Sequence, residues 1–196
     1  MSQHFGKYRG KVTRVDDPLN LGRLMVTAPS VLGRGNAVWA LPCTPYAGPG
    51  VGLVLTPPIG ANVWVEFEGG QIDAPIWTGG FWARGEFPRA PKSQAVVVLK
   101  TPSMELACDE AGGGGVSLVL GAPASSVPMA LKARDGAVSL AVKDVKLRIS
   151  PSEVVAEVGG SKLTLRSGVA LLQQGSAKVT LSNGSVSVND GELVVR

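Results

Sequence analysis

Apolar and polar residues alternate over short stretches throughout the second half of the chain. The period is two residues, which is typical of a β-strand with one apolar face. The residues that share the apolar side of these stretches are Val145, Leu147, Ile149, Leu163, Leu165, Val179, Leu181, Val186 and Val188. Lysine, arginine, threonine, serine and asparagine fill the positions between them. We therefore expect a series of short strands, each offering one aliphatic face.

Turn-forming residues separate these stretches at intervals of about eight residues. They are Gly136, Asp144, Pro151, Gly159, Gly168, Gly175, Gly184 and Gly191. This spacing fits one strand and one turn. No part of the chain shows helical amphipathic periodicity over three turns, so the sequence predicts an almost entirely β protein.

Residues 96–196 contain no Phe, Tyr or Trp, which limits how their apolar faces can be buried. A β-sandwich, a single-chain solenoid and an intertwined trimer all accommodate the pattern. A sandwich of this size normally includes aromatic residues in its core. A narrow prism shared by three chains needs only medium-sized aliphatic residues. We therefore favour a homotrimeric, intertwined triple-stranded β-helix with the nine apolar residues named above as its core.

The first part of the chain has a different pattern, with every aromatic residue and several short apolar runs. The strands expected there are 8–15, 23–28, 39–42, 51–56, 62–68 and 75–81. Such short strands with glycines at the bends predict a small barrel of the oligonucleotide/oligosaccharide-binding (OB) type. A polar, proline-rich segment follows. We expect an OB-fold barrel domain at 1–83, a linker at 84–95 and the trimeric shaft at 96–196.

The charged and nucleophilic residues do not form a recognisable catalytic or metal site. The net charge is +4, but the cations occur singly between apolar residues, as on a solvated strand face. The single histidine, His4, falls in a segment that we expect to be a flexible arm, and Cys43 and Cys108 have no Cys or His neighbours. We therefore expect no catalytic residues, no metal and no cofactor, and a protein that is not an enzyme. The N-terminus lacks the apolar core of a signal peptide.

Several spaced motifs in the first part of the chain agree in their order. They are Gly10-x-Val12, Asp17-Pro18-x-x-Leu-Gly-Arg23-x-x-Val26, Trp39-Ala40, the run 58–70 and Asp73-Ala74-Pro75-Ile76-Trp77-Thr78-Gly79-Gly80. This order resembles the OB barrel of central spike proteins in contractile injection systems, namely the phage baseplate assembly protein V and VgrG-like families. The linker leaves no room for the lysozyme domain that some members carry.

The resemblance implies a structural central spike of a contractile tail or injection-system baseplate. Such a spike links the hub or tube to the tip and pierces the target cell envelope. Its barrels would contact a baseplate hub protein, and its C-terminus, Leu193, Val194, Val195 and Arg196, would bind a tip protein of the PAAR type. The protein would assemble in the cytoplasm of the producing cell without a signal peptide. It would then belong to a virion tail or to the baseplate of an extracellular or cytoplasmic contractile particle.

A nucleic-acid- or glycan-binding OB barrel with a trimerisation stalk is the alternative. Single-stranded nucleic acids are bound by exposed aromatic residues interleaved with Lys and Arg. The stretch 50–80 contains neither Lys nor Arg, so the sequence predicts no specific nucleic-acid partner.

Overall fold

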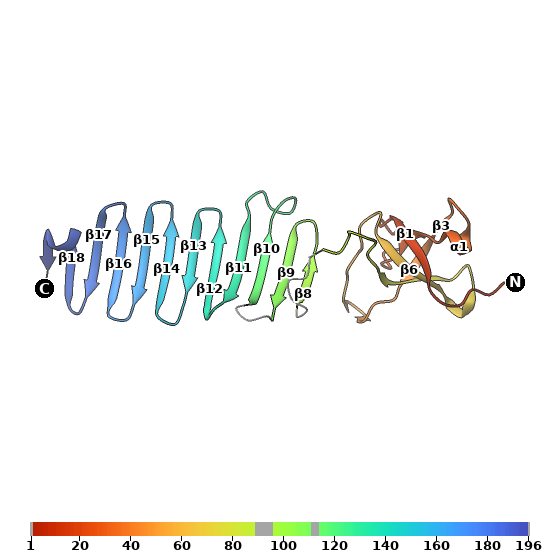
Figure 1. Cartoon of the computed structure of the whole chain (residues 1–196), viewed down its shortest axis with the longest axis horizontal. Coiled ribbons are helices and arrows are strands. Elements are labelled where there is room, and N and C mark those ends of the chain that lie inside the picture. Colours follow the sequence, from red (N-terminus) through yellow and green to blue (C-terminus); the bar gives the residue numbers. More distant parts are fainter. Residues whose placement is uncertain (1, 89–95, 111–113, 196) are drawn as a thin grey trace. The chain divides into compact units, whose positions relative to one another are not determined.

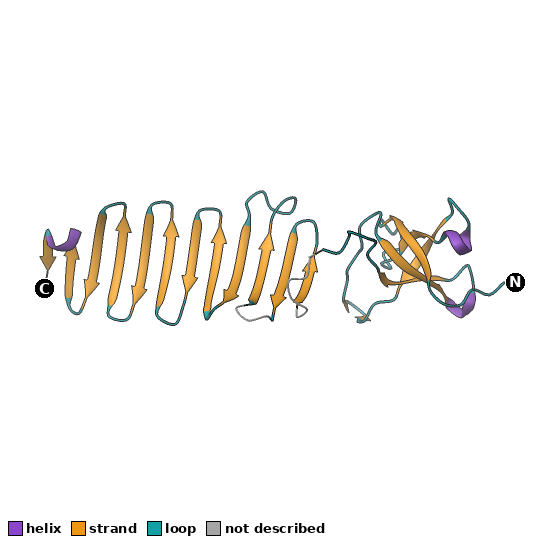
Figure 2. Cartoon of the chain, in the orientation of Figure 1, coloured by secondary structure: helices purple, strands orange, loops and turns teal. Residues whose placement is uncertain are grey.

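The computed structural model describes residues 2–88, 96–110 and 114–195. The chain divides into two compact units, residues 1–87 and residues 88–196, which we call the barrel unit and the sheet unit. Strands dominate both units, and the described helices are a single turn each (Figure 2). The prediction of an all-β protein is therefore confirmed.

The barrel unit is a closed barrel of five strands. They are β1 (Tyr8–Arg14), β2 (Leu24–Thr27), β3 (Ala37–Pro42), β6 (Asn62–Phe67) and β7 (Pro75–Gly80). The order around the barrel is β1-β2-β3-β7-β6, with β3 and β7 parallel and the other pairs antiparallel. This is the strand order of an OB fold, as the sequence predicted.

Alternation along the strands forms the core of the barrel. In β6, Val63, Val65 and Phe67 are buried, and the residues between them are partly exposed on the outside. The largest fully buried side chains are Leu24, Val12, Val26, Val63 and Val65, each at most 1% exposed. The barrel thus buries its own aliphatic residues completely.

Gly10 allows β1 to pass close to its neighbours. A Cβ atom at this position would lie 2.4 Å from the carbonyl oxygen of Thr27 and 2.8 Å from Cγ2 of Val65. Any side chain would therefore push strands apart at this point of the barrel wall.

The long connection between β3 and β6 differs from the prediction. We expected a barrel strand at 51–56, but only the hairpin β4 (Ala47–Gly48) and β5 (Val51–Gly52) forms there, as a separate two-stranded sheet. Gly50 has φ 73°, which fits the turn between them. Pro49, Pro57 and Pro58 bracket the segment, and because a proline has no N–H to donate to a neighbouring strand, pairing cannot extend beyond the segment at either end. Single helical turns occur at α1 (Pro29–Leu32) and η1 (Glu68–Gly70).

The sheet unit is one antiparallel sheet of twelve strands. They are β8 (Val96–Lys100), β9 (Met104–Asp109), β10 (Gly115–Leu120), β11 (Met129–Arg134), β12 (Ala137–Val142), β13 (Val145–Ile149), β14 (Glu153–Val158), β15 (Ser161–Arg166), β16 (Val169–Gln174), β17 (Ala177–Ser182), β18 (Ser185–Val188) and β19 (Leu193–Val195). Each strand pairs with the next in the chain, so the sheet is a meander (Figure 1).

Tight turns hold this meander in register. At Asp135-Gly136 and at Asn183-Gly184 both residues have positive φ, as a two-residue type I′ hairpin requires. The turns predicted from Gly136 to Gly184 all lie between strands.

The strand pairing differs from the intertwined β-helix that we expected. In an intertwined arrangement, strands of different copies alternate along the axis. Here every strand from β9 to β18 has both edges paired with strands of the same chain. Consequently, another copy can contact the interior of this sheet through its faces and not through its strand edges.

Candidate assembly face of the sheet

The register places most of the apolar strand residues on one side of the sheet, which we call the apolar face; Val98, Val119, Val155, Val169 and Leu171 lie on the other side. Its middle is a row with one residue from each strand, which we call the central row. The central row is Leu99, Leu106, Leu118, Leu131, Leu140, Leu147, Ala156, Leu163, Leu172, Val179, Val188 and Leu193. Cross-strand partners lie on the same face and contact each other, so these residues form a continuous aliphatic ladder.

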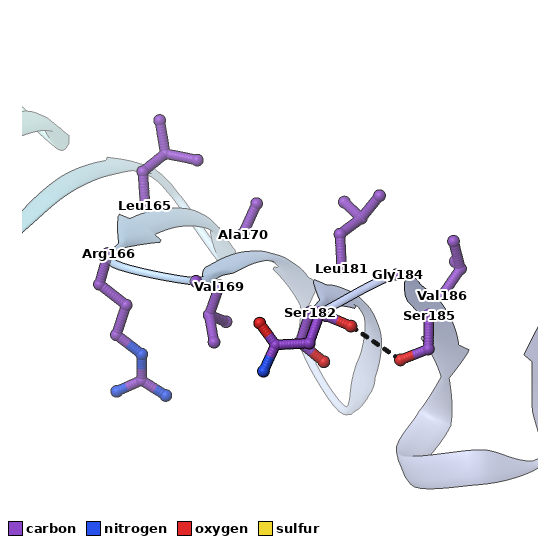
Figure 3. A pocket seen from close by; sticks show the side chains of 11 residues that line it. Leu165, Arg166, Val169, Ala170, Leu181, Ser182, Gly184, Ser185 and Val186 are labelled. Carbon is purple, nitrogen blue, oxygen red and sulfur yellow. Dashed lines mark hydrogen bonds between the residues drawn. The ribbon is translucent and has the colours of Figure 1, made fainter. Parts of the chain in front are cut away.

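A second row runs along each side of the ladder. Flank one is Val97, Cys108, Val116, Ala133, Val138, Ile149, Val154, Leu165, Ala170, Leu181 and Val186. Flank two is Met104, Leu120, Met129, Val142, Val145, Val158, Ser161, Gln174 and Ala177. Figure 3 shows the side chains of Leu165, Ala170, Leu181 and Val186 on one side of the ribbon, opposite Arg166 and Val169.

One polar pair interrupts this apolar surface. Ser161 and Gln174 are cross-strand partners on flank two, and the Ser161 hydroxyl donates a hydrogen bond to Oε1 of Gln174. Because each satisfies part of the other's hydrogen-bonding capacity, the pair is less costly to cover than two isolated polar groups.

All nine predicted core residues lie on the apolar face. Leu147, Leu163, Val179 and Val188 belong to the central row, Ile149, Leu165, Leu181 and Val186 to flank one, and Val145 to flank two. The sequence reasoning missed the first half of the ladder, including Leu118, Leu131 and Leu140. The alternation in 129–134 and 137–142 was the available signal for these residues.

The apolar face is uncovered in the single chain. Leu131, Leu140 and Leu172 of the central row are 45%, 45% and 54% exposed, and Val97 and Val158 at the flanks reach 66% and 57%. The residues of this unit that are almost buried, Ala107 and Thr164, lie on the opposite face. The sheet therefore has an apolar surface but no core of its own.

The total surface area gives the scale of this exposure. The chain exposes 13478 Å². Two compact monomeric domains that divide 20.2 kDa equally would expose about 10,500 Å² together. The excess is about 3,000 Å², whereas a standard protein interface buries about 800 Å² per partner. The uncovered surface is thus large enough for a permanent assembly.

The opposite face of the sheet carries the charges. Lys162 lies 3.5 Å from Glu157, Arg148 lies 3.5 Å from Glu153, and Lys100 lies 2.8 Å from Glu105. These ion pairs are exposed, and such pairs add little stability. Their main consequence is that the two faces of the sheet differ in chemistry, one being charged and the other aliphatic.

On the barrel unit, Asp17 organises the loop between β1 and β2. Its carboxylate accepts hydrogen bonds from the backbone N–H groups of Leu19, Leu21 and Arg23. The Arg23 guanidinium donates two more, at 2.9 and 2.7 Å. The bond from the Arg23 side chain holds the pKa of Asp17 well below its ordinary value, and the backbone donors lower it further. The Asp-Pro and Gly-Arg parts of the motif therefore belong to one hydrogen-bonded unit.

The barrel also carries two groups of arginine and aromatic side chains that the sequence analysis overlooked. The guanidiniums of Arg14 and Arg23 lie 5.5 and 5.3 Å from the ring centre of Trp39. Arg9 lies over both Trp64 and Phe81. These three cations precede the stretch 50–80, which contains neither Lys nor Arg. Arg14 and Arg23 are engaged by carboxylates, at 2.7 Å from Asp16 and Asp17 respectively, which makes them poor phosphate ligands.

The placement of His4 corrects the prediction of a flexible arm. The His4 backbone N–H donates to the carbonyl of Gly70 at 2.9 Å, and its ring packs on Phe67 and Tyr8. These contacts hold the N-terminal segment against the barrel, so the description of this segment as a free arm is wrong.

The C-terminal residues predicted to bind a tip protein form the last strand. Leu193, Val194 and Val195 make up β19, which pairs only with β18, and Leu193 is 59% exposed. Arg196 lies outside the described residues.

The titratable residues do not gather into a metal site. Among the residues that the structure describes, no group of three or more His, Cys, Asp or Glu side chains could hold a metal ion. Cys43 and Cys108 are free thiols in different units. A search of the same residues finds no helix with the length and apolar character needed to cross a membrane.

Residues 8–82 match the model of a family described as the type VI secretion system/phage-baseplate injector OB domain. The matched segment contains all five barrel strands. No curated protein matches the chain. The domain match supports the baseplate spike family that the motif order suggested, and with it a structural role in a phage tail or injection particle. Most of the barrel unit thus matches the injector OB-domain family.

Proposed function

We propose that the protein is the homotrimeric central spike of a contractile tail or injection-system baseplate. The observation that carries the proposal is the uncovered apolar face, which follows an injector OB domain in the same chain. An open sheet with this face cannot remain single in water, because its leucine ladder would stay hydrated. Copies of the same chain provide a cover of equal length and equal chemistry.

Three sheets arranged as the faces of a prism would bring their central rows together at the axis. The pairing within each chain favours this side-by-side arrangement over interleaved strands. Every level of the prism would then receive Leu, Val or Ala from each copy at its centre. Three such side chains fill a narrow axis, where aromatic residues would be too large.

Rigidity is the proposed mechanism. The backbone hydrogen bonds of the sheet run along the direction in which the strands are stacked, and they are continuous from β8 to β19. A prism of three such sheets would resist local unfolding under an axial load, because all copies share each layer. The shaft would thereby transmit force from the tube or hub to the target cell envelope, with no chemical step and no cofactor.

The two ends of the protein would make the other contacts. The barrel would bind the baseplate hub, and the three C-terminal strands would form a small apolar platform for a PAAR-type tip protein. The particle is a virion tail, or an extracellular or cytoplasmic contractile particle, assembled in the cytoplasm of the producing cell.

Light scattering of the purified full-length chain, together with its resistance to heat and SDS, tests the proposal. We expect a particle of three times 20.2 kDa that resists dissociation. A stable monomer at micromolar concentration would contradict both the shaft and the spike.

A further inference from the structure

We propose that the charged face of the sheet holds a binding site for a phosphorylated sugar, in a hollow over strands β9, β10 and β11. The hollow lies on the side opposite the apolar face. It is therefore formed within the single chain and does not depend on the proposed assembly. The inference goes beyond the proposed function, because it adds a ligand to a shaft that needs none for its rigidity.

The strand register builds the hollow from two short rows of residues. The rows are Ala107, Ser117 and Lys132, and Asp109, Gly115 and Arg134, each with one residue from β9, β10 and β11 in turn. Because β10 contributes only a glycine and a serine, it forms the floor, and the strands on either side form the walls. The walls are about 10 Å apart, twice the spacing of neighbouring strands. The hollow has a volume of about 180 Å³, which suits a small polar ligand.

Gly115 keeps the floor of the hollow low beside β11. A Cβ atom at this position would lie 2.2 Å from the carbonyl oxygen of Ala133 and 3.2 Å from the Cα atom of Arg134. Any other residue would push β10 and β11 apart, so the strand pairing itself requires the glycine. The space above it is consequently open to a ligand.

The wall formed by β11 is suited to a phosphate group. Lys132 and Arg134 are two residues apart on one strand, so they lie on the same face, about 7 Å from each other along it. Lys132 makes no ion pair with any residue that the structure describes, and the contact of Arg134 with Asp135, at 3.3 Å, is exposed and therefore weak. An arginine binds phosphate through two parallel N–H donors and a lysine through its charge. The hydroxyl of Ser117, the cross-strand neighbour of Lys132, adds a third donor.

The opposite wall carries a carboxylate and selects a different group. Asp109 lies across Gly115 from Arg134. A carboxylate has about four acceptor positions, so the interaction that Asp109 already makes leaves others for a ligand. This wall repels a second anionic group and accepts hydrogen bonds from hydroxyl groups. A molecule with a phosphate at one end and hydroxyl groups at the other, which describes a sugar phosphate, matches both walls.

Isothermal titration of the full-length protein with glucose 6-phosphate, inorganic phosphate and glucose tests the site. At low ionic strength, where exposed charges are least screened, we expect one glucose 6-phosphate per chain, with weaker binding of phosphate and none of glucose. Lys132→Ala combined with Arg134→Ala should weaken glucose 6-phosphate binding at least tenfold. Asp109→Asn should weaken glucose 6-phosphate binding several-fold without weakening phosphate binding, because it removes the carboxylate that accepts from the sugar and repels the anion.

Lys146→Ala combined with Arg148→Ala is the matched control. It removes the same two residue types, at the same spacing and on the same face, from β13, whose side chains do not line the hollow. This variant should keep its affinity within about threefold. An equal loss in both double variants would show diffuse attraction to the charged face and overturn the site. Inorganic phosphate that bound as tightly as glucose 6-phosphate would overturn the sugar phosphate as its ligand.

The assembly provides an independent readout. Because the substituted residues lie opposite the apolar face, each variant should have the same mass in light scattering as the unchanged protein. Absence of glucose 6-phosphate binding by a protein that is still trimeric would overturn the site and leave the spike function standing. A monomeric protein that binds glucose 6-phosphate would overturn the spike and support the site.

Discussion

The barrel and the sheet are both built from strands with alternating apolar and polar residues, but only the barrel buries its apolar side chains within the chain. The barrel closes in a ring of five strands, and Val26, Val63 and Val65 are 0% exposed inside it. The sheet unit has twelve strands that never close, and Leu131, Leu140 and Leu172 of its central row remain 45%, 45% and 54% exposed. Closure lets a small domain bury its own core, whereas an open single layer leaves one face to be covered by something else.

This difference separates the sources of stability of the two units. Barrel stability depends on side chains within one chain and should not change with protein concentration. The stability of the proposed shaft depends on association and should rise with concentration. Tryptophan fluorescence can measure the stability of the barrel separately from that of the sheet. All tryptophans lie in the barrel unit, and residues 96–196 contain no aromatic residue.

The largest effect should follow from a charge in the central row. Leu147→Asp would bring three carboxylates together in one layer of the shaft, and burying unpaired charges costs several kcal/mol each. We expect complete loss of the trimer, seen as monomers or aggregates in light scattering. The barrel should still fold, with tryptophan fluorescence like that of the unchanged protein.

The matched control places the same residue on the charged face. Ser139 lies across the strand pairs from Lys132 and Arg148, so Ser139→Asp adds a carboxylate between two cations. This variant should remain trimeric. If Leu147→Asp also formed normal trimers, the apolar face would not be the assembly surface.

The corresponding change in the barrel should have a smaller and strictly local effect. Leu24 is 1% exposed, and Leu24→Ala should cost about 2–5 kcal/mol of barrel stability through lost burial and a cavity. The melting transition seen by tryptophan fluorescence should fall by about 10 °C or more. The trimer mass should not change.

Leu19→Ala is the control for this change, since Leu19 is 61% exposed on the loop after β1. It should shift the barrel transition little. A trimer that dissociated with Leu24→Ala would show that the two units do not fold independently.

The strands and turns of both units could largely be predicted from the sequence, because they depend on local patterns of apolar, polar and turn-forming residues. Most of the barrel strands were placed within two residues, and the turns of the sheet lie where glycines, Asp144 and Pro151 marked them. The exception was 51–56, where alternating apolar residues suggested a strand but the surrounding prolines and glycines prevent barrel pairing. The apolar face was also predicted, since alternation with a period of two fixes which residues share a side.

The pairing of strands could not be predicted in the same way. An intertwined shaft and a single-chain meander require the same alternation and the same turns, so Leu147 and Leu163 would point inward in both. The bonds of Asp17 were missed for another reason. A carboxylate that binds three backbone N–H groups and an arginine leaves no periodic signal, only a short motif that also reads as an ordinary turn.

The loop at Asp17 should make the barrel sensitive to acid. The pKa of Asp17 is lower in the folded protein than in the unfolded chain, so near pH 4 and below the unfolded chain binds more protons at this residue than the folded protein does. The stability that the ionised Asp17 contributes is therefore present above about pH 4 and is lost as the pH falls. Asp17→Asn should lower the barrel melting temperature by a few degrees at pH 7 and flatten its decline between pH 4 and pH 2. Asp16→Asn, at an exposed carboxylate that pairs with Arg14, should have a smaller effect. Equal acid sensitivity in the Asp17→Asn variant would argue against this role.

The smallest effect on stability should come from the end of the sheet. The strand β19 has three residues and a single neighbour, β18, so it shares little of the stability of the sheet. Removal of residues 193–196 should leave the trimer mass and melting temperature almost unchanged. The truncated spike should nevertheless fail to retain a PAAR-type tip protein in a pull-down, while a Gln173→Ala variant with an intact end retains it. Undiminished binding by the truncated protein would place the tip contact elsewhere, and dissociation of its trimer would mean that the shaft closes from its C-terminal end.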